Sequence, residues 1–205
     1  MLLDFGCGVG KHAVELAKKG YRVLGYDTAE YYIDKAKKLA TKHHLNRLLT
    51  FYNTDDFLRT KNNEFDFIYS IAFPIGYSDK QSISSFLGLV LKSLKNDHFF
   101  LFGFPYTREN REKFLPRNKW EEKDGILYLA DEKIDNNGRR VEKYIVINPQ
   151  EDTLTEWTDI SDYYYLEEIE QMLKSAGFII IDKFKNTEKE PAETAEDVHF
   201  IYCKS

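Results

Sequence analysis

The first 32 residues, MLLDFGCGVGKHAVELAKKGYRVLGYDTAEYY (residues 1–32), decide the fold of this chain. A short apolar run leads into three alternate glycines, Gly6, Gly8 and Gly10. The next segment repeats apolar side chains at the helical period, and a second apolar run ends in Asp27. This order predicts a strand, a glycine turn, a helix and a second strand. The connection between the strands is a helical crossover, so we expect the strands to be parallel.

The chemistry of the turn indicates a ligand. Parallel strands place the glycine turn and Asp27 at the same carboxyl edge of the sheet. Glycines let the backbone approach a ligand closely, and the free N–H groups of a helix N-terminus attract anionic or hydrogen-bond-accepting groups. Asp27 stands where a carboxylate accepts hydrogen bonds from ribose hydroxyls. The pattern therefore favours a nucleoside-bearing cofactor, and a structural turn without a ligand is the alternative.

The spacing of the glycines distinguishes between cofactors. The dinucleotide fingerprint GxGxxG requires a third glycine where this chain has Lys11, so we expect that NAD is not a ligand. The stretches LLDFGCGVG (residues 2–10) and VLGYDTA (residues 23–29) resemble the class I S-adenosylmethionine-dependent methyltransferases. The resemblance extends over nearly all of the chain and is strongest for small-molecule enzymes with a β insert after the fifth strand.

The resemblance implies the cofactor and its site. In this family an acidic residue after the third strand accepts a hydrogen bond from the adenine amino group, and Asp55 is the best match, with Asp56 as its neighbour. Without the family motif, this pair would equally be a solvated turn. The cofactor-binding residues expected for S-adenosylmethionine are Asp4, Gly6, Cys7, Gly8, Gly10, His12, Asp27, Thr28, Asp55, Asp56, Phe57 and Ser70.

The remaining pattern and the resemblance together predict an α/β fold, doubly wound, with a mostly parallel seven-stranded sheet. The last strand is expected to be antiparallel and to lie between the fifth and sixth. Thr28 is expected to cap the second helix, or to precede it directly. The other expected strands are 48–52, 65–71, 98–104, 178–184 and 198–203, and the other expected helices are 29–45, 81–94 and 165–173.

Residues 105–158 differ in kind from the rest. Alternating apolar residues around Asn136-Asn137-Gly138 predict a hairpin, and Glu151-Asp152 predicts a further turn. We expect a main domain of residues 1–104 and 159–205, with the insert as an antiparallel flap over the carboxyl edge. An oligomer contact or a structural extension is the alternative. The expected aromatic walls of an acceptor pocket are Trp120, Tyr128, Tyr144 and Trp157.

The methyl acceptor is harder to identify. Tyr77, in the loop after the fourth strand, is the candidate for orienting a nucleophile, and an aromatic wall is its alternative role. His12 is the second candidate, and for it a place in the first turn of the helix, near the cofactor carboxylate, is favoured over the role of a base. Three functions compete: a small-molecule N- or O-methyltransferase, a methyltransferase acting on tRNA or protein, and a catalytically silent cofactor-binding module.

Composition sets outer limits. The chain has 205 residues and a net charge of -5, which argues against a nucleic-acid partner. Only Cys7 and Cys203 are present, without metal-ligand spacing, so we expect no metal. We expect no membrane segment and a cytoplasmic protein, and a homodimer is one option for its assembly. The family usually places one or two helices before the first strand; either the chain is truncated there or it works without that lid.

Overall fold

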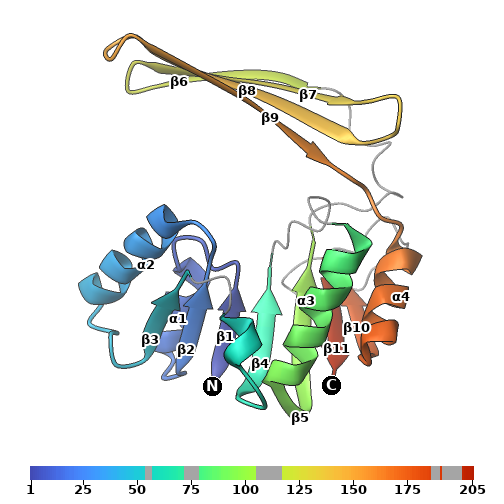
Figure 1. The fold of residues 1–205 in the computed structure, drawn as a ribbon. Coiled ribbons are helices and arrows are strands. Elements are labelled where there is room, and N and C mark those ends of the chain that lie inside the picture. Colours follow the sequence, from blue (N-terminus) through green and yellow to red (C-terminus); the bar gives the residue numbers. More distant parts are fainter. Residues whose placement is uncertain (54–56, 72–78, 105–116, 186–189, 191–199) are drawn as a thin grey trace.

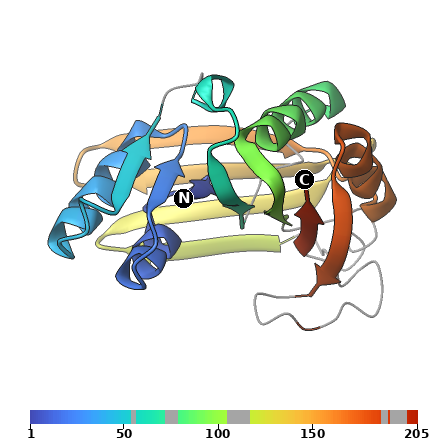
Figure 2. The same cartoon turned by 90° about the horizontal axis from the view of Figure 1, so that it is seen from below.

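The computed structural model places a seven-stranded sheet with flanking helices beneath a separate four-stranded antiparallel sheet (Figures 1 and 2). It describes residues 1–53, 57–71, 79–104, 117–185, 190 and 200–205. Within these residues, no helix is long and apolar enough to cross a membrane. The seven-stranded sheet and the antiparallel insert confirm the expected fold class.

The large sheet has the order β10-β11-β5-β4-β1-β2-β3. Strands β1 to β5 are parallel to one another. Strand β11 pairs antiparallel with both of its neighbours, β5 and β10, and so lies in the position expected for the last strand. The parallel strands all end at one carboxyl edge. The strands of this sheet are β1 (Leu2–Phe5), β2 (Val23–Tyr26), β3 (Leu49–Tyr52), β4 (Phe65–Ser70), β5 (Leu94–Gly103), β10 (Ile179–Phe184) and β11 (Phe200–Lys204).

Helices cover both faces of this sheet, as a doubly wound fold requires (Figure 2). One apolar core joins helices α1 and α2 to the sheet, and a second, larger core joins α3 and α4 to the other face. The burial follows from the helical period, which places the apolar side chains of each helix on one stripe. The helices are α1 (Lys11–Lys18), α2 (Glu30–Lys42), α3 (Lys80–Ser93) and α4 (Leu166–Ala176), with a short 3-10 helix η1 (Leu58–Thr60).

The start of α2 and the end of α4 can be compared with the ends expected from the sequence. Thr28 precedes the N-cap residue of α2, Ala29, so the second of the two expectations for Thr28 is confirmed, and Ala29 has no side chain able to cap. Asp27 Oδ1 accepts a hydrogen bond from the Ala29 N–H at 3.0 Å, which fixes the residue that leads into the helix. At the end of α4, Gly177 has a φ of 105° and forms the expected left-handed C-cap.

The second sheet is a meander of β6 (Arg117–Lys123), β7 (Ile126–Ile134), β8 (Arg140–Asn148) and β9 (Thr153–Ser161). We call it the insert sheet. The hairpin between β7 and β8 turns at Gly138, whose φ is 76°, and the next turn ends at Asp152, as expected. The insert sheet lies over the carboxyl edge of the large sheet (Figure 1). The expected strand pattern is extended by β6, which begins before Trp120.

Gly103, the last residue of β5, is expected to be essential for stability. A Cβ at this position would lie 2.3 Å from the carbonyl oxygen of Ile71 and 2.7 Å from the Phe200 ring. A backbone oxygen cannot rotate away, so Gly103→Ala should cost about 3 kcal/mol and lower the melting temperature by roughly 6–12 °C. Thermal unfolding followed by circular dichroism measures this. Gly88→Ala on α3 is the control, because open space surrounds Gly88 and alanine favours a helix.

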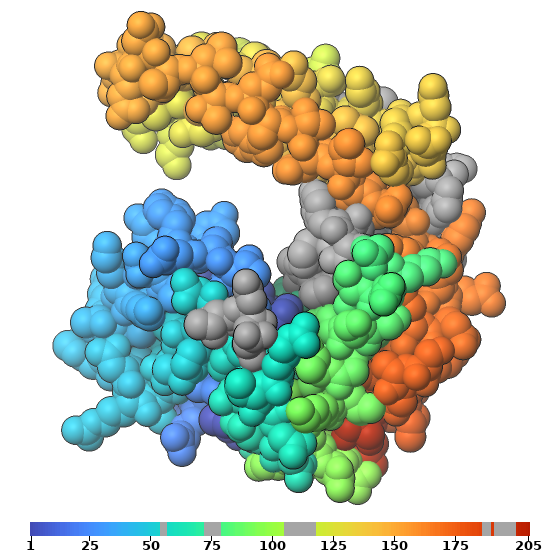
Figure 3. Space-filling model, in the orientation of Figure 1, coloured from blue at the N-terminus to red at the C-terminus, as the bar shows by residue number. Residues whose placement is uncertain are grey.

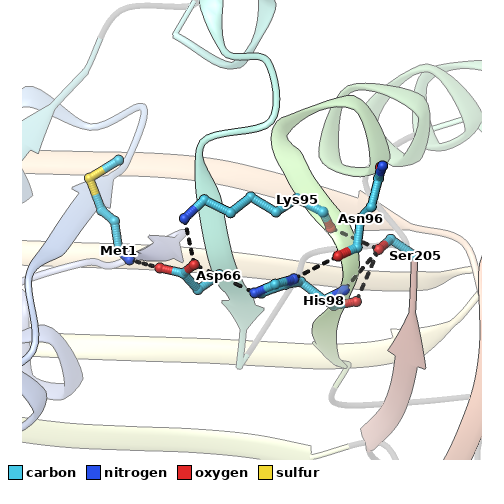
Figure 4. Close-up of polar contacts among 6 residues, drawn as sticks. All are labelled: Met1, Asp66, Lys95, Asn96, His98 and Ser205. Carbon is cyan, nitrogen blue, oxygen red and sulfur yellow. Dashed lines mark hydrogen bonds and ion pairs between the residues drawn. The ribbon is translucent and has the colours of Figure 1, made fainter.

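The opposite, amino edge of the sheet is held by one carboxylate (Figure 4). Asp66 accepts a hydrogen bond from Lys95 Nζ at 2.6 Å and forms an ion pair with the Met1 amine. His98 Nε2 lies 3.5 Å from the same carboxylate, and the His98 N–H donates to Ser205 Oγ at 3.1 Å. This network links β1, β4, β5 and the end of β11 on the side away from the glycine turn.

This network predicts a pH-dependent contribution to stability. Hydrogen bonds from Lys95 and from the amine lower the pKa of Asp66 to about 2, so its stabilising effect is fully present above its ordinary pKa. That effect is lost as the pH falls through about 2. Asp66→Asn should lower the melting temperature at pH 7 by an amount that shrinks to nothing near pH 2. Asp97→Asn, at a carboxylate that is 81% exposed, is the control and should change little.

Candidate functional site

The glycine turn between β1 and α1 forms the centre of the candidate site. Gly6, Gly8 and Gly10 all have positive φ, at 76°, 52° and 76°, so all three positions favour glycine. The N–H groups of Gly6 and Cys7 both donate to the Tyr26 carbonyl oxygen, at 2.8 and 2.9 Å. These bonds fix the turn against the end of β2, at the carboxyl edge of the sheet.

Asp27 lies directly beside this turn, as expected. Its Oδ2 accepts a hydrogen bond from the Gly8 N–H at 2.8 Å, and its Oδ1 accepts from the Ala29 N–H at 3.0 Å. Each carboxylate oxygen has two lone pairs, so both retain the capacity to accept a further hydrogen bond. The backbone contacts hold the carboxylate rigidly at the strand end, where it can receive a pair of hydroxyl groups.

The glycines of the turn have different surroundings. Nothing lies within 4 Å of a Cβ built on Gly8, so this position opens onto free space. A Cβ on Gly10 would lie 3.0 Å from both the Ala36 Cβ and the Phe51 ring. Gly10 therefore allows close packing of α1 on α2 and β3, whereas Gly8 leaves room beside the Asp27 carboxylate. A cradle of this kind fits a ligand that approaches the backbone.

Buried polar groups lie beneath the turn. Asp4 is 2% exposed, and burial raises the pKa of its carboxyl to about 7, with the Asp27 charge contributing. The neighbouring Tyr69 hydroxyl and the Ala13 N–H partly offset this rise. Ser70, also buried, has its Oγ 4.0 Å from a Cβ built on Gly6. Burial likewise raises the pKa of the Cys7 thiol, which makes it a poor nucleophile.

Other expected site residues are placed differently. The buried ring of Phe57 stacks on Tyr52 at 4.8 Å and on Tyr26 at 5.6 Å, so it forms part of an aromatic wall beyond β3. His12 is exposed in the first turn of α1, and Thr28 precedes α2. Asp55, Asp56 and Tyr77 lie outside the described residues, so their roles stay predictions.

Tyr69 is a site residue that the sequence did not single out. A tyrosine within the run FDFIYS is typical of a strand core. Its place became visible only through the register, because Tyr69 on β4 pairs directly with Asp4 on β1. In the sequence, the one signal that could have marked Tyr69 as a site residue was its position next to Ser70 at the end of the strand.

The two faces of the insert sheet differ in burial. Glu132, Glu142 and Ser161 are buried, whereas Leu154, Ile160 and Trp120 on the other face are 65%, 47% and 73% exposed. The rest of the molecule lies on one side of this sheet only (Figure 1), and we infer that the face with the buried residues is the inner one, turned toward it. Figure 3 shows the open space between the insert sheet and the domain below it.

The inner face combines acidic and aromatic groups. Tyr144 stacks on Trp157 at 5.0 Å, and the Tyr144 hydroxyl donates to Glu142 Oε1 at 2.7 Å. Arg140 forms ion pairs with Glu132 and Glu142. Tyr128 lies one row further along the same face. Trp120 does not, because it pairs with Leu129 in the alternate register and therefore points to the outer face. The expectation that Trp120 shares a pocket wall with Tyr128, Tyr144 and Trp157 was therefore wrong, because Trp120 lies on the opposite face of the sheet.

Comparison with known proteins shows a likeness to methyltransferases. Residues 2–97 match a family model described as a methyltransferase domain. This stretch, which contains the glycine turn and Asp27, is therefore similar to methyltransferase domains. Sterol 24-C-methyltransferase of Saccharomyces cerevisiae is 39% identical over 74 residues, which cover 35% of this chain and 19% of the relative. The sterol 24-C-methyltransferase of Gibberella zeae is 35% identical over 134 residues, 63% of this chain and 35% of the relative.

Solved structures extend the likeness in fold to the whole chain. The CcbJ methyltransferase of Streptomyces caelestis superposes with a TM-score of 0.80 at 17% identity, covering 100% of this chain and 82% of that one. The sugar N-methyltransferase KedS8 of Streptoalloteichus gives 0.73 at 15% identity, covering 99% and 78%. By contrast, the chain spans only 19–35% of the length of the curated sterol methyltransferases it matches.

The glycine spacing of the turn after β1 predicts that NADH does not bind at this edge. Lys11 opens α1 where a dinucleotide fold needs glycine for close packing of helix and strand. Titration of NADH followed by fluorescence should therefore show no saturable signal that S-adenosylmethionine displaces. Lys11→Gly is an informative second variant and should also show no NADH binding. Binding of NADH by this variant would mean that the third glycine alone decides the cofactor. Competitive, saturable binding to the native protein would contradict the prediction.

Proposed function

We propose that this domain transfers a methyl group from S-adenosylmethionine to an oxygen or nitrogen atom of a small molecule. The observation that carries the proposal is the position of the insert sheet over the carboxyl edge (Figure 1). It lies over the edge at which β1 and β2 end and limits approach to that edge. A roofed site of this kind suits a small acceptor better than the surface of a folded macromolecule.

The residues of the edge support specific roles toward the cofactor. Asp27 would accept hydrogen bonds from the ribose hydroxyls, because both its oxygens are held at the strand end by backbone N–H groups. The space over Gly8 would admit the chain that joins ribose to sulfur. The free N–H groups at the start of α1 would hold the cofactor carboxylate. Phe57 and Tyr52 would contribute to the wall beside the adenine ring.

The reaction places limited demands on the protein. The cofactor supplies a methyl group on a sulfonium, and transfer is an in-line displacement by the acceptor atom. Alignment of the reacting atoms can contribute about 7–11 kcal/mol. The inner face of the insert sheet, with its stacked Tyr144 and Trp157 and its buried carboxylates, would orient the acceptor and exclude water. Acceptors bearing hydroxyl or amino groups fit such a lining because carboxylates accept their hydrogen bonds.

A turnover assay on separated acceptor pools tests the proposal. The protein is incubated with methyl-labelled S-adenosylmethionine and one of three pools: small amines and alcohols, bulk tRNA, or a mixture of unmodified proteins. Label is expected in the small-molecule pool alone. Label in tRNA or protein would replace the small-molecule function with a macromolecular one. Tight cofactor binding with no labelled product from any pool would favour a catalytically silent module.

A further inference from the structure

The outer face of the insert sheet carries an uncovered apolar belt. Cross-strand partners share a face of a sheet, so the register assigns side chains of all four strands to this face. Among the described residues, none of the side chains on the outer face is buried. A groove of about 290 Å³ on this face has Trp120, Leu129 and Ile145 in its lining. The belt consists of two neighbouring cross-strand rows, Trp120, Leu129 and Ile145, and Leu127, Ile147 and Leu154.

An uncovered belt of this kind indicates a partner. Sheets in stable domains pack at least one face against another layer, and contiguous exposed apolar patches mark interaction sites. Figure 1 shows the insert sheet as a single layer, with the large sheet and its helices on the inner side and no described element on the outer side. Covering the outer face would remove the belt from water, which is the main favourable contribution to association.

The charges of the outer face favour a second copy of this chain over a lipid surface. They are nearly balanced, so the face lacks the basic excess with which proteins bind anionic headgroups. Lys143 Nζ lies 3.0 Å from Glu156 Oε1. Asp131 is the cross-strand partner of Lys143, yet it has no ion-pair partner among the described residues. The charged residues of this face are Glu122, Asp131, Lys133, Lys143 and Glu156.

The area of the outer face fits a dimer of modest affinity. Strands β7, β8 and β9 have nine residues each. With a rise of about 3.4 Å per residue and a spacing of about 4.8 Å between the four strands, the face measures roughly 600 Å². Two such faces bury roughly 1,200 Å² together, which is the lower end of the range for specific, stable interfaces.

We propose that the outer faces of two copies pack against each other about a two-fold axis that runs parallel to the strands, between β7 and β8. This axis places β7 of one copy over β8 of the other and keeps each cross-strand row opposite the same row. Leu129 then meets Ile145 of the second copy, so the belt is covered. Asp131 meets Lys143 of the second copy and gains a cation. Both carboxyl edges stay open, because each large sheet lies on the far side of its own insert sheet (Figure 1).

Leu129→Asp tests the belt. The native protein is expected to sediment as a dimer at micromolar concentration in analytical ultracentrifugation. In the variant the dissociation constant of the dimer should rise at least about 100-fold, because the packed faces would bury an unpaired carboxylate. Ile181→Asp on β10 is the matched control: Ile181 is 51% exposed and Leu129 is 37% exposed, and this variant should leave the dimer intact. Circular dichroism checks that both variants are folded.

Two charge reversals test the axis. Lys143→Glu and Asp131→Lys each place like charges opposite one another in their own dimers, so each chain alone should dimerise about tenfold more weakly than the native protein. In a dimer that contains one chain of each kind, opposite charges face each other again at both contacts. An equal mixture of the two variants is therefore expected to dimerise about as tightly as the native protein.

The sedimentation results decide the assignment. A native protein that stays monomeric throughout the micromolar range would overturn it, as would a dimer that Leu129→Asp leaves intact or a mixture of the charge variants without rescue. Co-sedimentation of the monomer with phosphatidylcholine vesicles would assign the outer face to a lipid surface instead. The affinity for S-adenosylmethionine is expected to be equal in the native protein and in Leu129→Asp, so the proposed function is tested separately from the dimer.

Discussion

Gly8→Val is expected to eliminate measurable S-adenosylmethionine binding while the protein stays folded. Gly8 has a φ of 52°, which a β-branched residue adopts only at a cost of about 1–2 kcal/mol or more. No atom lies within 4 Å of the new Cβ, so the protein itself accommodates the side chain. The valine would occupy the space proposed for the cofactor. Calorimetric titration measures the loss, and circular dichroism checks the fold.

Gly20→Val is the matched control for this variant. Gly20 also has a positive φ, at 90°, and also opens onto free space, but it follows the far end of α1. It should therefore show a comparable backbone strain with normal cofactor affinity. If both variants lost affinity equally, backbone strain and not occupied space would explain the result. If Gly8→Val bound the cofactor normally, the glycine turn would not be the binding site.

Asp27→Ala is expected to weaken S-adenosylmethionine binding by two to four orders of magnitude. Two hydrogen bonds from ribose hydroxyls to a carboxylate contribute about 1.5–3 kcal/mol each. The variant also removes the acceptor for the Gly8 and Ala29 N–H groups, so the turn loses its brace. Equilibrium binding of the cofactor measures the effect.

Two further variants interpret the Asp27 result. Asp27→Asn retains one acceptor oxygen and should fall between the native protein and Asp27→Ala. Asp34→Ala removes an exposed carboxylate on α2 and should leave the affinity unchanged. Native-like affinity in Asp27→Ala would remove this residue from the site.

Local patterns made the centre of the fold predictable. The alternate glycines and Asp27 lie within 22 residues of one another, so their placement depends on one turn and one crossover. The same holds for the Asn-Gly hairpin turn and for the glycine that ends α4. Each of these signals is a backbone conformation that only a few residue types adopt easily. Such requirements are visible in the chain itself.

Features that depend on register were not visible in the sequence. The Asp4–Tyr69 pair joins residues 65 positions apart, and a one-residue shift of either strand would separate them. Trp120 was assigned to the wrong face of the insert sheet for the same reason.

The insert sheet leaves the large sheet after β5 and returns at α4, and all its described strand pairings are internal. Among the described residues, no strand of the large sheet pairs with a strand of the insert sheet. Such an arrangement makes the insert an exchangeable cassette. A lineage could replace it to accept new molecules while keeping the same methyl donor, and a protein engineer could graft the insert of a relative between residues 104 and 165 with the same expectation.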